Sequence, residues 1–226
     1  MNVNAIIWDC DGVLIDSEIL ACRVASEYYT RAGFPLTTSE YIRRFAGHGK
    51  AQIAATIREE TGRDLAAVID WTKEEADREA LFEAELRAVP GIDKFLEQCK
   101  ARRLPMAVAS GSSLRRLKHS LRLTGLWDYF DPHIYSTEQV ARGKPAPDVY
   151  LLAARKLGVS PDRCLVIEDA EHGTRAGKAA GMTVYGFIGA SHCTAEWAEH
   201  LRAAGADAVF FGLTDLQAAV DLSISN

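Results

Sequence analysis

The chain has 226 residues, 48% of them hydrophobic and 25% charged, which is ordinary for a globular protein of one large or two small domains. Its formal net charge is −5 and it has no basic run, so nothing favours nucleic acid or an anionic membrane as a partner. The five cysteines are scattered and odd in number, which argues against a disulfide framework and predicts a cytoplasmic protein with reduced thiols. The oligomeric state stays open.

Short apolar runs recur along the chain and predict strands that are buried on both faces. They cover residues 5–8, 106–109, 133–135, 164–167, 183–187 and 208–211. Amphipathic patterns between the later runs predict helices over residues 92–102, 114–123, 147–157 and 175–180. This alternation of strand and helix predicts an α/β fold with a doubly wound, Rossmann-like parallel sheet.

One long segment interrupts the alternation. Helical patterns alone run through residues 19–31, 39–45, 52–61 and 65–87, between the first predicted strand and the second. We therefore expect an inserted all-α helical domain at residues 17–88. The α/β core domain would then consist of residues 1–16 and 89–226.

Polar residues follow four of the predicted strands at the point where each strand ends. They are Asp9 and Asp11 after the first strand, Ser110 after the second, and the pair Glu168 and Asp169 after the fourth, while Lys144 follows the third strand further along the chain. Because ligands bind beyond the carboxyl ends of the strands in an open parallel sheet, we expect these side chains to gather at one rim. Two carboxylates about 4 Å apart repel by roughly 4 kcal/mol at an effective dielectric of about 20. A hard divalent cation with oxygen ligands, most commonly Mg²⁺, would neutralise them.

A small phosphate monoester is the substrate that suits such a rim. Its dianion repels an anionic nucleophile, so the site has to supply positive charge and hydrogen-bond donors. An aspartate can then attack phosphorus and form an aspartyl phosphate. The rim therefore predicts phosphoryl transfer from a small-molecule partner.

Four short stretches, in this order, resemble the motifs of the haloacid dehalogenase superfamily. They are DCDGVLIDS at 9–17, ASGSS at 109–113, KPAPD at 144–148, and IED at 167–169 with Gly173 following. The resemblance covers essentially the whole chain. The helical insert resembles the cap of the subgroup that includes β-phosphoglucomutases, phosphoglycolate phosphatases and sugar-phosphate phosphatases.

The resemblance implies a role for each carboxylate at the rim. Asp9 would be the nucleophile, and Asp11 the general acid that protonates the leaving oxygen and then the base that activates water. Mg²⁺ would be held by the Asp9 carboxylate, the Asp11 backbone carbonyl and Asp169. Glu168 would act as a ligand through water or as a support for the ligands.

The other core motifs resemble phosphate-binding elements. Ser110 would donate to a phosphoryl oxygen, and Lys144 would offset charge between nucleophile and phosphate. Gly12 would let the backbone approach the phosphate closely. Gly111 and Ser112 are predicted to bind the substrate. Ser112 and Ser113 stand at the start of a predicted helix, where they either bind an anion or simply cap the helix.

Candidates in and near the insert concern specificity. Lys50 and His48, in the glycine-bracketed stretch GHGK, either meet a distal anionic group of the substrate or are ordinary solvated residues. Glu18, just after the first motif, either faces the substrate or makes no contact with it. Asp16 is expected to orient or cap the first helix of the insert together with Ser17. His172 is expected to be a loop residue and not a ligand.

The predicted function is a Mg²⁺-dependent phosphatase that acts on a small phosphorylated metabolite, a sugar or sugar-acid phosphate. The alternative is a phosphosugar mutase similar to β-phosphoglucomutase, but Ala21 stands where those enzymes carry a histidine. Dehalogenases lack the second aspartate, which here is Asp11. Phospho-accepting receiver domains are shorter and have no large helical insert.

Overall fold

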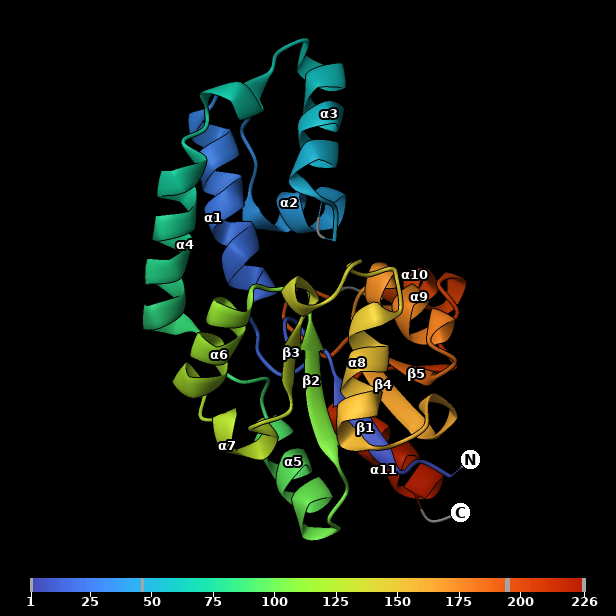
Figure 1. The fold of residues 1–226 in the computed structure, drawn as a ribbon. Coiled ribbons are helices and arrows are strands. Elements are labelled where there is room, and N and C mark those ends of the chain that lie inside the picture. The colour runs from blue at the N-terminus through green and yellow to red at the C-terminus, as the bar shows by residue number, and fades with distance from the viewer. Residues whose placement is uncertain (1, 46, 194–195, 225–226) are drawn as a thin grey trace. The chain divides into compact units, whose positions relative to one another are not determined.

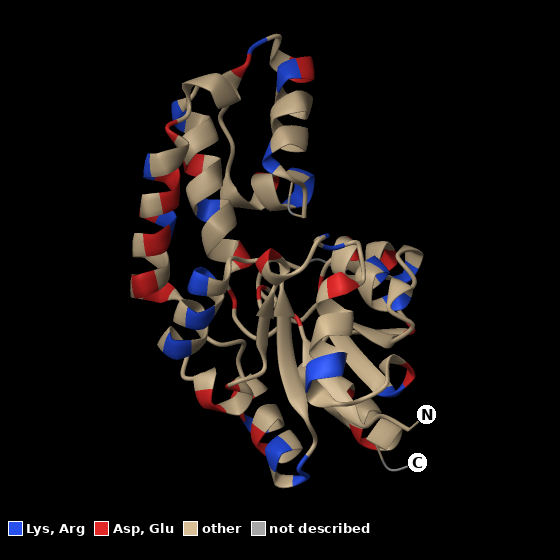
Figure 2. Ribbon diagram, in the orientation of Figure 1, with Lys and Arg blue, Asp and Glu red and all other residues tan. Residues whose placement is uncertain are grey.

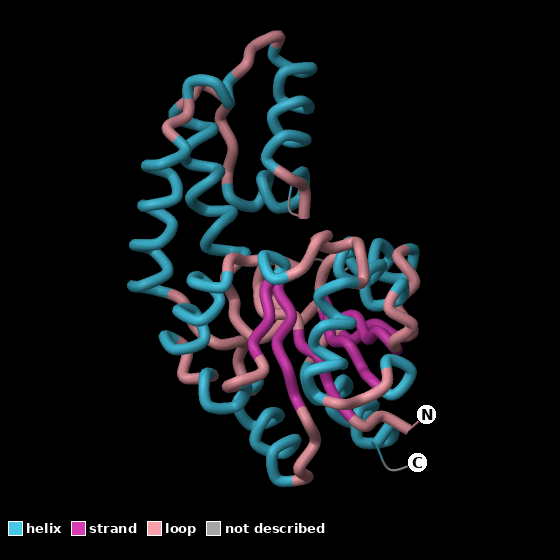
Figure 3. Tube along the Cα trace, viewed as in Figure 1, coloured by secondary structure: helices cyan, strands magenta, loops and turns pink. Residues whose placement is uncertain are grey.

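The structure is a computed structural model that describes residues 2–45, 47–193 and 196–224 (Figure 1). The chain divides into two compact units. The core unit comprises Met1–Asp16 and Arg87–Asn226, and the helical unit comprises Ser17–Leu86. Every strand of Figure 3 belongs to the core unit, and the helical unit contains only helices and loops.

The described residues of the core unit form a six-stranded sheet whose paired strands are all parallel. The strands are β1 (Ala5–Trp8), β2 (Met106–Ser110), β3 (Ile134–Ser136), β4 (Cys164–Glu168), β5 (Thr183–Phe187) and β6 (Ala208–Phe210). Their order is β3-β2-β1-β4-β5-β6. The chain changes direction across the sheet between β1 and β4, and a ligand crevice is expected at that switch point.

Helices cover both faces of the sheet (Figure 1). The helices of the core unit are α5 (Ile92–Ala101), α6 (Leu114–Leu123), α7 (Trp127–Phe130), α8 (Asp148–Leu157), α9 (Glu171–Ala179), α10 (Trp197–Ala203) and α11 (Leu213–Ile224). Ile7 packs in one apolar cluster with Val149 of α8 and Ala176 of α9. The next residue, Trp8, points to the other face and meets Phe95 of α5 edge to face, with ring centroids 5.2 Å apart. This alternation confirms the doubly wound sheet.

Two features of the core unit differ from the sequence prediction. Helix α9 begins at Glu171 and not at residue 175, so the prediction that His172 is a loop residue was wrong. Helices α7, α10 and α11 were not predicted. Helix α10 is short, and its buried Ala198 and Leu201 pack against Ile188 after β5, a contact between distant parts of the chain that periodicity does not reveal.

The helical unit consists of α1 (Glu18–Arg31), α2 (Thr38–Phe45), α3 (Lys50–Thr61), the 3-10 turn η1 (Leu65–Val68) and α4 (Trp71–Glu85). Tyr29, Tyr41 and Trp71 form the aromatic centre of its core. The single helix predicted over residues 65–87 is divided: the first part ends at Val68, and Asp70 caps α4 by accepting from the Lys73 N–H at 3.0 Å. Helix α4 carries acidic and basic residues along its length (Figure 2). Among the described residues, no helix combines the length and apolar character needed to cross a membrane.

Candidate active site

Polar side chains gather where β2, β1 and β4 end, on either side of the switch point. Ser110 is 1% exposed, Asp9 7%, Glu168 1% and Asp169 4%. The strand register sets Trp8 opposite Ile167, and the Asp9 N–H donates to the Ile167 carbonyl at 2.9 Å. Asp9 is therefore fixed beside the acidic pair that ends β4. Polar groups buried to this degree require hydrogen-bond or ion-pair partners.

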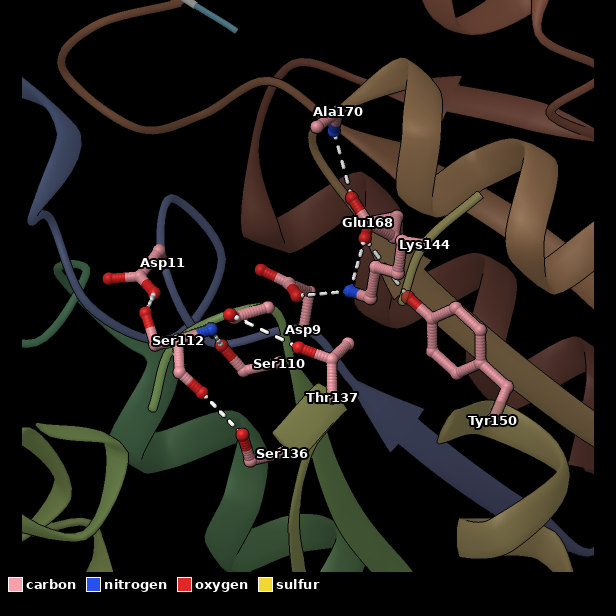
Figure 4. A network of polar contacts seen from close by, with 11 residues as sticks. Asp9, Asp11, Ser110, Ser112, Ser136, Thr137, Lys144, Tyr150, Glu168 and Ala170 are labelled. Atoms are coloured by element: carbon pink, nitrogen blue, oxygen red, sulfur yellow. Dashed lines mark hydrogen bonds and ion pairs between the residues drawn. The ribbon is translucent and has the colours of Figure 1, made fainter. Parts of the chain in front are cut away.

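Lys144 is the main partner of these carboxylates (Figure 4). Its ammonium nitrogen lies 2.5 Å from Asp9 Oδ1 and 2.7 Å from Glu168 Oε1, and its side chain is 3% exposed. The Tyr150 hydroxyl donates to the same Glu168 oxygen at 3.0 Å, and the Ala170 N–H donates to the other at 2.8 Å. One buried lysine thus bridges the end of β1 to the end of β4.

The directions of the pKa shifts separate Asp9, whose charged form is disfavoured, from Glu168 and Lys144, whose charged forms are favoured. Burial raises the pKa of Asp9 well above its usual value, and repulsion from Glu168 and Asp169 adds to the increase while Lys144 opposes it. Burial alone would also raise the pKa of Glu168, but Lys144, His172 and the hydrogen bond from the Ala170 N–H together outweigh burial, and the pKa is lowered. Lys144 behaves likewise: burial opposes its charge, yet Asp9 and Glu168 raise its pKa. A further cation beside Asp9 would favour the ionised form of that carboxyl.

The same carboxylates are suited to hold a hard cation. One oxygen each from Asp9, Glu168 and Asp169 lies within 4.8 Å of the others. If all three carboxylates are ionised, the one ammonium of Lys144, which contacts Asp9 and Glu168, leaves two formal negative charges in excess. An all-oxygen donor set with that excess charge fits Mg²⁺.

Two glycines make room for the acidic pair of β4. A Cβ atom on Gly173 would lie 1.5 Å from Glu168 Oε1, and one on Gly12 would lie 1.8 Å from Asp169 Oδ2. Gly12 also has a φ of +80°, in the left-handed region that favours glycine. Its place in the first motif therefore serves the packing of Asp169 as well as the turn.

Replacing Gly12 with alanine is expected to lower the free energy of unfolding by about 1–3 kcal/mol through backbone conformation alone. The clash with Asp169 adds to this and displaces a carboxylate of the site, so phosphatase activity falls as well. Thermal unfolding and phosphate release measure the two effects. Gly212→Ala is the control, because its φ is not in that region and its Cβ would meet no described atom within 4 Å. Equal behaviour of the two variants would contradict the packing role of Gly12.

A second polar network positions Asp11 and the loop after β2 (Figure 4). The Ser112 hydroxyl donates to Asp11 Oδ2 at 2.6 Å, and its N–H donates to Ser110 Oγ at 3.0 Å. The Gly111 and Ser112 carbonyls accept from the hydroxyls of Thr137, at 3.3 Å, and Ser136, at 2.7 Å. This network ties the loop after β2 to the end of β3.

The capping of α6 is performed by Ser113, whose hydroxyl accepts from the Arg116 N–H at 3.3 Å. Of the two roles considered for Ser112, capping is therefore wrong. Arg116 also approaches Asp11, with Nη2 3.3 Å from Oδ1. Asp11 is thus held from two sides by α6 and the residue before its cap.

Asp16 has a different partner from the one expected. Its carboxylate accepts from the Ser191 hydroxyl and from the Ser191 N–H, the latter at 3.2 Å. The Ser17 side chain makes no capping bond to α1, so the predicted capping role was wrong. Asp16 instead anchors the loop after β5. That loop carries His192, which was not predicted and whose Nε2 lies 3.3 Å from Asp169 Oδ2. Its only sequence signal is the pair His192-Cys193 after the fifth strand.

The remaining candidates lie in the helical unit. Lys50 is the first residue of α3, and its ammonium lies 2.9 Å from the buried Glu74 carboxylate and 4.3 Å from the Trp71 ring centre. Its side chain is 54% exposed, so Lys50 is a solvated helix-initiating residue, as one alternative expected, that also pairs with Glu74. His48 is exposed, and Glu18 begins α1 half-buried. Contacts of these three with substrate stay predictions.

Glu74→Gln is expected to lower the free energy of unfolding by about 1–3 kcal/mol, because a buried carboxylate that pairs with two cations is replaced by a neutral amide. Those cations are Lys50, at 2.9 Å, and Arg78, at 3.5 Å. Glu75→Gln makes the same chemical change one residue along α4 at a side chain that is 62% exposed, and it should cost less than about 0.5 kcal/mol. Urea unfolding measures the free energy of unfolding of both variants. Equal decreases would contradict the stabilising role of the buried Glu74 ion pairs.

The fold and the site together define a class: a doubly wound α/β enzyme whose acidic, lysine-bridged centre lies at the switch point of the sheet. The haloacid dehalogenase-like hydrolase model matches residues 3–181. A 6-phosphogluconate phosphatase of Escherichia coli is 30% identical over 84% of this chain and 85% of its own length. A phosphorylated carbohydrates phosphatase of Thermotoga maritima is 34% identical over 82% of this chain and 86% of its own. The chain belongs to the haloacid dehalogenase-like hydrolases.

Solved structures agree with this assignment. A haloacid dehalogenase-like protein of Agrobacterium tumefaciens superposes with a TM-score of 0.89 at 38% identity and covers 98% of this chain and 99% of its own. A family hydrolase of Deinococcus radiodurans, solved with bound phosphate and sodium, has a TM-score of 0.85 at 32% identity and covers 98% and 96%. The family model and the phosphatase relatives identify this chain as a phosphoric monoester hydrolase.

Proposed function

We propose that the protein is a Mg²⁺-dependent phosphatase that hydrolyses a small phosphorylated metabolite through an aspartyl phosphate formed on Asp9. The observation that carries the proposal is the buried Asp9 carboxylate, which shares the Lys144 ammonium with Glu168 at the switch point of the sheet. A carboxylate nucleophile in that position has to stay ionised, and a cation has to offset the negative charge of the incoming phosphate.

In the first step an Asp9 carboxylate oxygen attacks phosphorus, and the bond from phosphorus to the ester oxygen breaks as the bond to Asp9 forms. Asp11 gives its proton to the departing ester oxygen. A proton donor must be protonated and lie within hydrogen-bond reach of that oxygen, so Asp11 has to exchange its Ser112 and Arg116 contacts for the substrate. Ser110 and Lys144 offer donors to the phosphoryl oxygens.

In the second step Asp11, now ionised, removes a proton from water. The water oxygen attacks the phosphorus of the aspartyl phosphate, and the bond between phosphorus and Asp9 breaks. Asp9 returns as a carboxylate, and Asp11 is protonated for the next cycle. The products are the free alcohol and inorganic phosphate.

The Asp9, Glu168 and Asp169 carboxylates, with the Asp11 backbone carbonyl, would hold Mg²⁺. When bound, the ion supplies positive charge that offsets the phosphate dianion and the developing negative charge. The chain's own contribution is to keep these oxygens together. Lys144 neutralises part of their repulsion, and Gly12 and Gly173 leave space for them.

The substrate class follows from the relatives and the helical unit. Relatives named for 6-phosphogluconate, phosphorylated carbohydrates and fructose 1-phosphate support a sugar or sugar-acid phosphate. We propose that the helical unit, predicted from the sequence as residues 17–88, acts as a cap that recognises the part of the substrate beyond its phosphate group. Lys50, His48 and Glu18 are its candidate contacts. A cytoplasmic location is part of the same proposal.

Removing the metal is expected to abolish phosphate release. A panel of sugar and sugar-acid phosphates is assayed with Mg²⁺, with EDTA, and with EDTA followed by excess Mg²⁺, and substrates are ranked by kcat/KM. The proposal expects release that EDTA stops and Mg²⁺ restores. Full activity in EDTA would overturn the metal requirement. Conversion of β-glucose 1-phosphate to the 6-phosphate without phosphate release would instead favour the mutase.

A further inference from the structure

A second cluster of metal-binding side chains adjoins the acidic centre in the core unit. One ligand atom each from Asp169, His192 and Cys193 lies within 4.8 Å of the others. We propose that these three residues form a site for a thiophilic divalent cation, Zn²⁺ being the physiological example, and that this site shares Asp169 with the Mg²⁺ centre.

The distances suit a tetrahedral ion. His192 Nε2 lies 3.3 Å from Asp169 Oδ2 and 3.4 Å from Cys193 Sγ. Ligands bound at the usual zinc distances of about 2.0–2.3 Å in a tetrahedron are separated by roughly 3.3–3.7 Å. Cys193 Sγ also lies 3.9 Å from Nδ1 of the same ring, so the sulfur is beside the imidazole and not in front of Nε2. A rotation of the Cys193 side chain would bring its sulfur to the ion that Nε2 and the Asp169 carboxylate share.

The chemistry of the donors separates this cluster from its neighbour. Asp9, Glu168 and Asp169 offer only oxygen, which suits Mg²⁺, whereas imidazole and thiolate favour zinc. Binding would release the Cys193 thiol proton to solvent and leave sulfur, nitrogen and oxygen on the ion. Cys193 is partly exposed and His192 is buried, so an ion can enter from the cysteine side. Three protein ligands leave the fourth position for water.

The surrounding residues hold the three ligands in place without metal. The Ser191 hydroxyl and N–H both donate to Asp16, which fixes the loop next to His192. Trp197 packs edge-on against the His192 ring, with centroids 5.8 Å apart, and its indole N–H donates to the Asp169 carbonyl at 2.7 Å. The site therefore needs little rearrangement on binding, which favours affinity.

Sharing Asp169 gives the site a consequence for activity. Its Oδ2 is the oxygen that faces His192. A zinc ion held there engages a carboxylate that the proposed Mg²⁺ centre uses, so zinc inhibits phosphate release in competition with Mg²⁺. This consequence rests on the proposed function, whereas binding itself does not.

Binding is tested by titrating the full-length protein with Co²⁺, which substitutes for zinc and gives a near-ultraviolet charge-transfer band when a thiolate coordinates it. The wild type and Cys99→Ala, which removes a buried thiol in α5, are expected to show the band. Cys193→Ala and Cys193→Ser are expected to lack it. No band in the folded wild type, or a band that survives loss of Cys193, would overturn the site whether or not any ester is hydrolysed.

Inhibition is tested by measuring phosphate release at fixed Mg²⁺ with increasing Zn²⁺. Loss of Cys193 is expected to leave activity without zinc unchanged and to raise the half-inhibitory zinc concentration at least about tenfold, since losing even an outer contact costs about 10–100-fold in metal affinity. Raising Mg²⁺ should relieve inhibition of the wild type. Equal zinc sensitivity of the wild type and Cys193→Ala would overturn the shared-ligand mechanism. Absence of activity in every protein, with the cobalt band present, would reject the proposed function alone.

Discussion

Asp9→Asn is expected to lower kcat for phosphate release by about four to six orders of magnitude, as removal of a covalent nucleophile does in other enzymes. The amide cannot attack phosphorus, although it has almost the shape of the carboxylate. Rapid acid quenching of the wild type with substrate should give a protein heavier by one phosphoryl group. The variant should give none. The rate of phosphate release and the mass of the quenched protein together distinguish loss of the nucleophile from loss of substrate binding.

The fold is expected to survive this change, because Lys144 keeps its contact with Glu168 at 2.7 Å when the charge of Asp9 is removed. Asp148→Asn is the matched control, since it makes the same chemical change at a carboxylate that pairs with the exposed Arg142 at 2.8 Å. It should keep the wild-type rate and the phosphoryl adduct. An Asp9→Asn protein that releases phosphate at more than about a hundredth of the wild-type rate would contradict nucleophilic catalysis by this residue.

The fold and the acidic centre were predictable from the sequence, because both depend on local patterns. Runs buried on both faces mark the strands, and a polar residue at the end of a run marks the carboxyl edge of a parallel sheet. Asp9, Ser110 and Glu168 could therefore be assigned to one rim before their separation was known. The strand register then places Asp9 beside Glu168, since it sets Trp8 opposite Ile167.

The partners of these residues could not be predicted, because they come from distant parts of the chain. Asp16 precedes a helical pattern and suggests a cap, but its hydrogen bonds go to Ser191, which lies 175 residues away. Lys50 suggests a solvated charge until α4 brings the buried Glu74 to it. His192 has no motif of its own, and only the packing of the loop after β5 reveals its contact with Asp169.

Lys144→Met is expected to lower the free energy of unfolding by about 3–5 kcal/mol when metal is absent, because breaking a buried ion pair leaves uncompensated charge in the core. Asp9 and Glu168 would then face each other without the ammonium that lies 2.5 and 2.7 Å from them. Catalysis should fall as well, since the phosphate loses a cationic partner. Chemical denaturation in EDTA measures the loss of stability, and phosphate release measures the loss of rate.

Lys178→Met is the matched control. The Lys178 ammonium also contacts two carboxylate oxygens, both of Asp207, at 2.7 and 2.8 Å, but the two side chains are 35% and 36% exposed. Solvent screens such a pair, so its removal should cost less than about 1 kcal/mol. Mg²⁺ should raise the melting temperature of Lys144→Met more than that of the wild type, because a bound cation replaces the missing charge and binding to the folded state stabilises it. If both variants lose equal stability, or if Mg²⁺ stabilises Lys144→Met no more than the wild type, Lys144 is not what holds the carboxylates together.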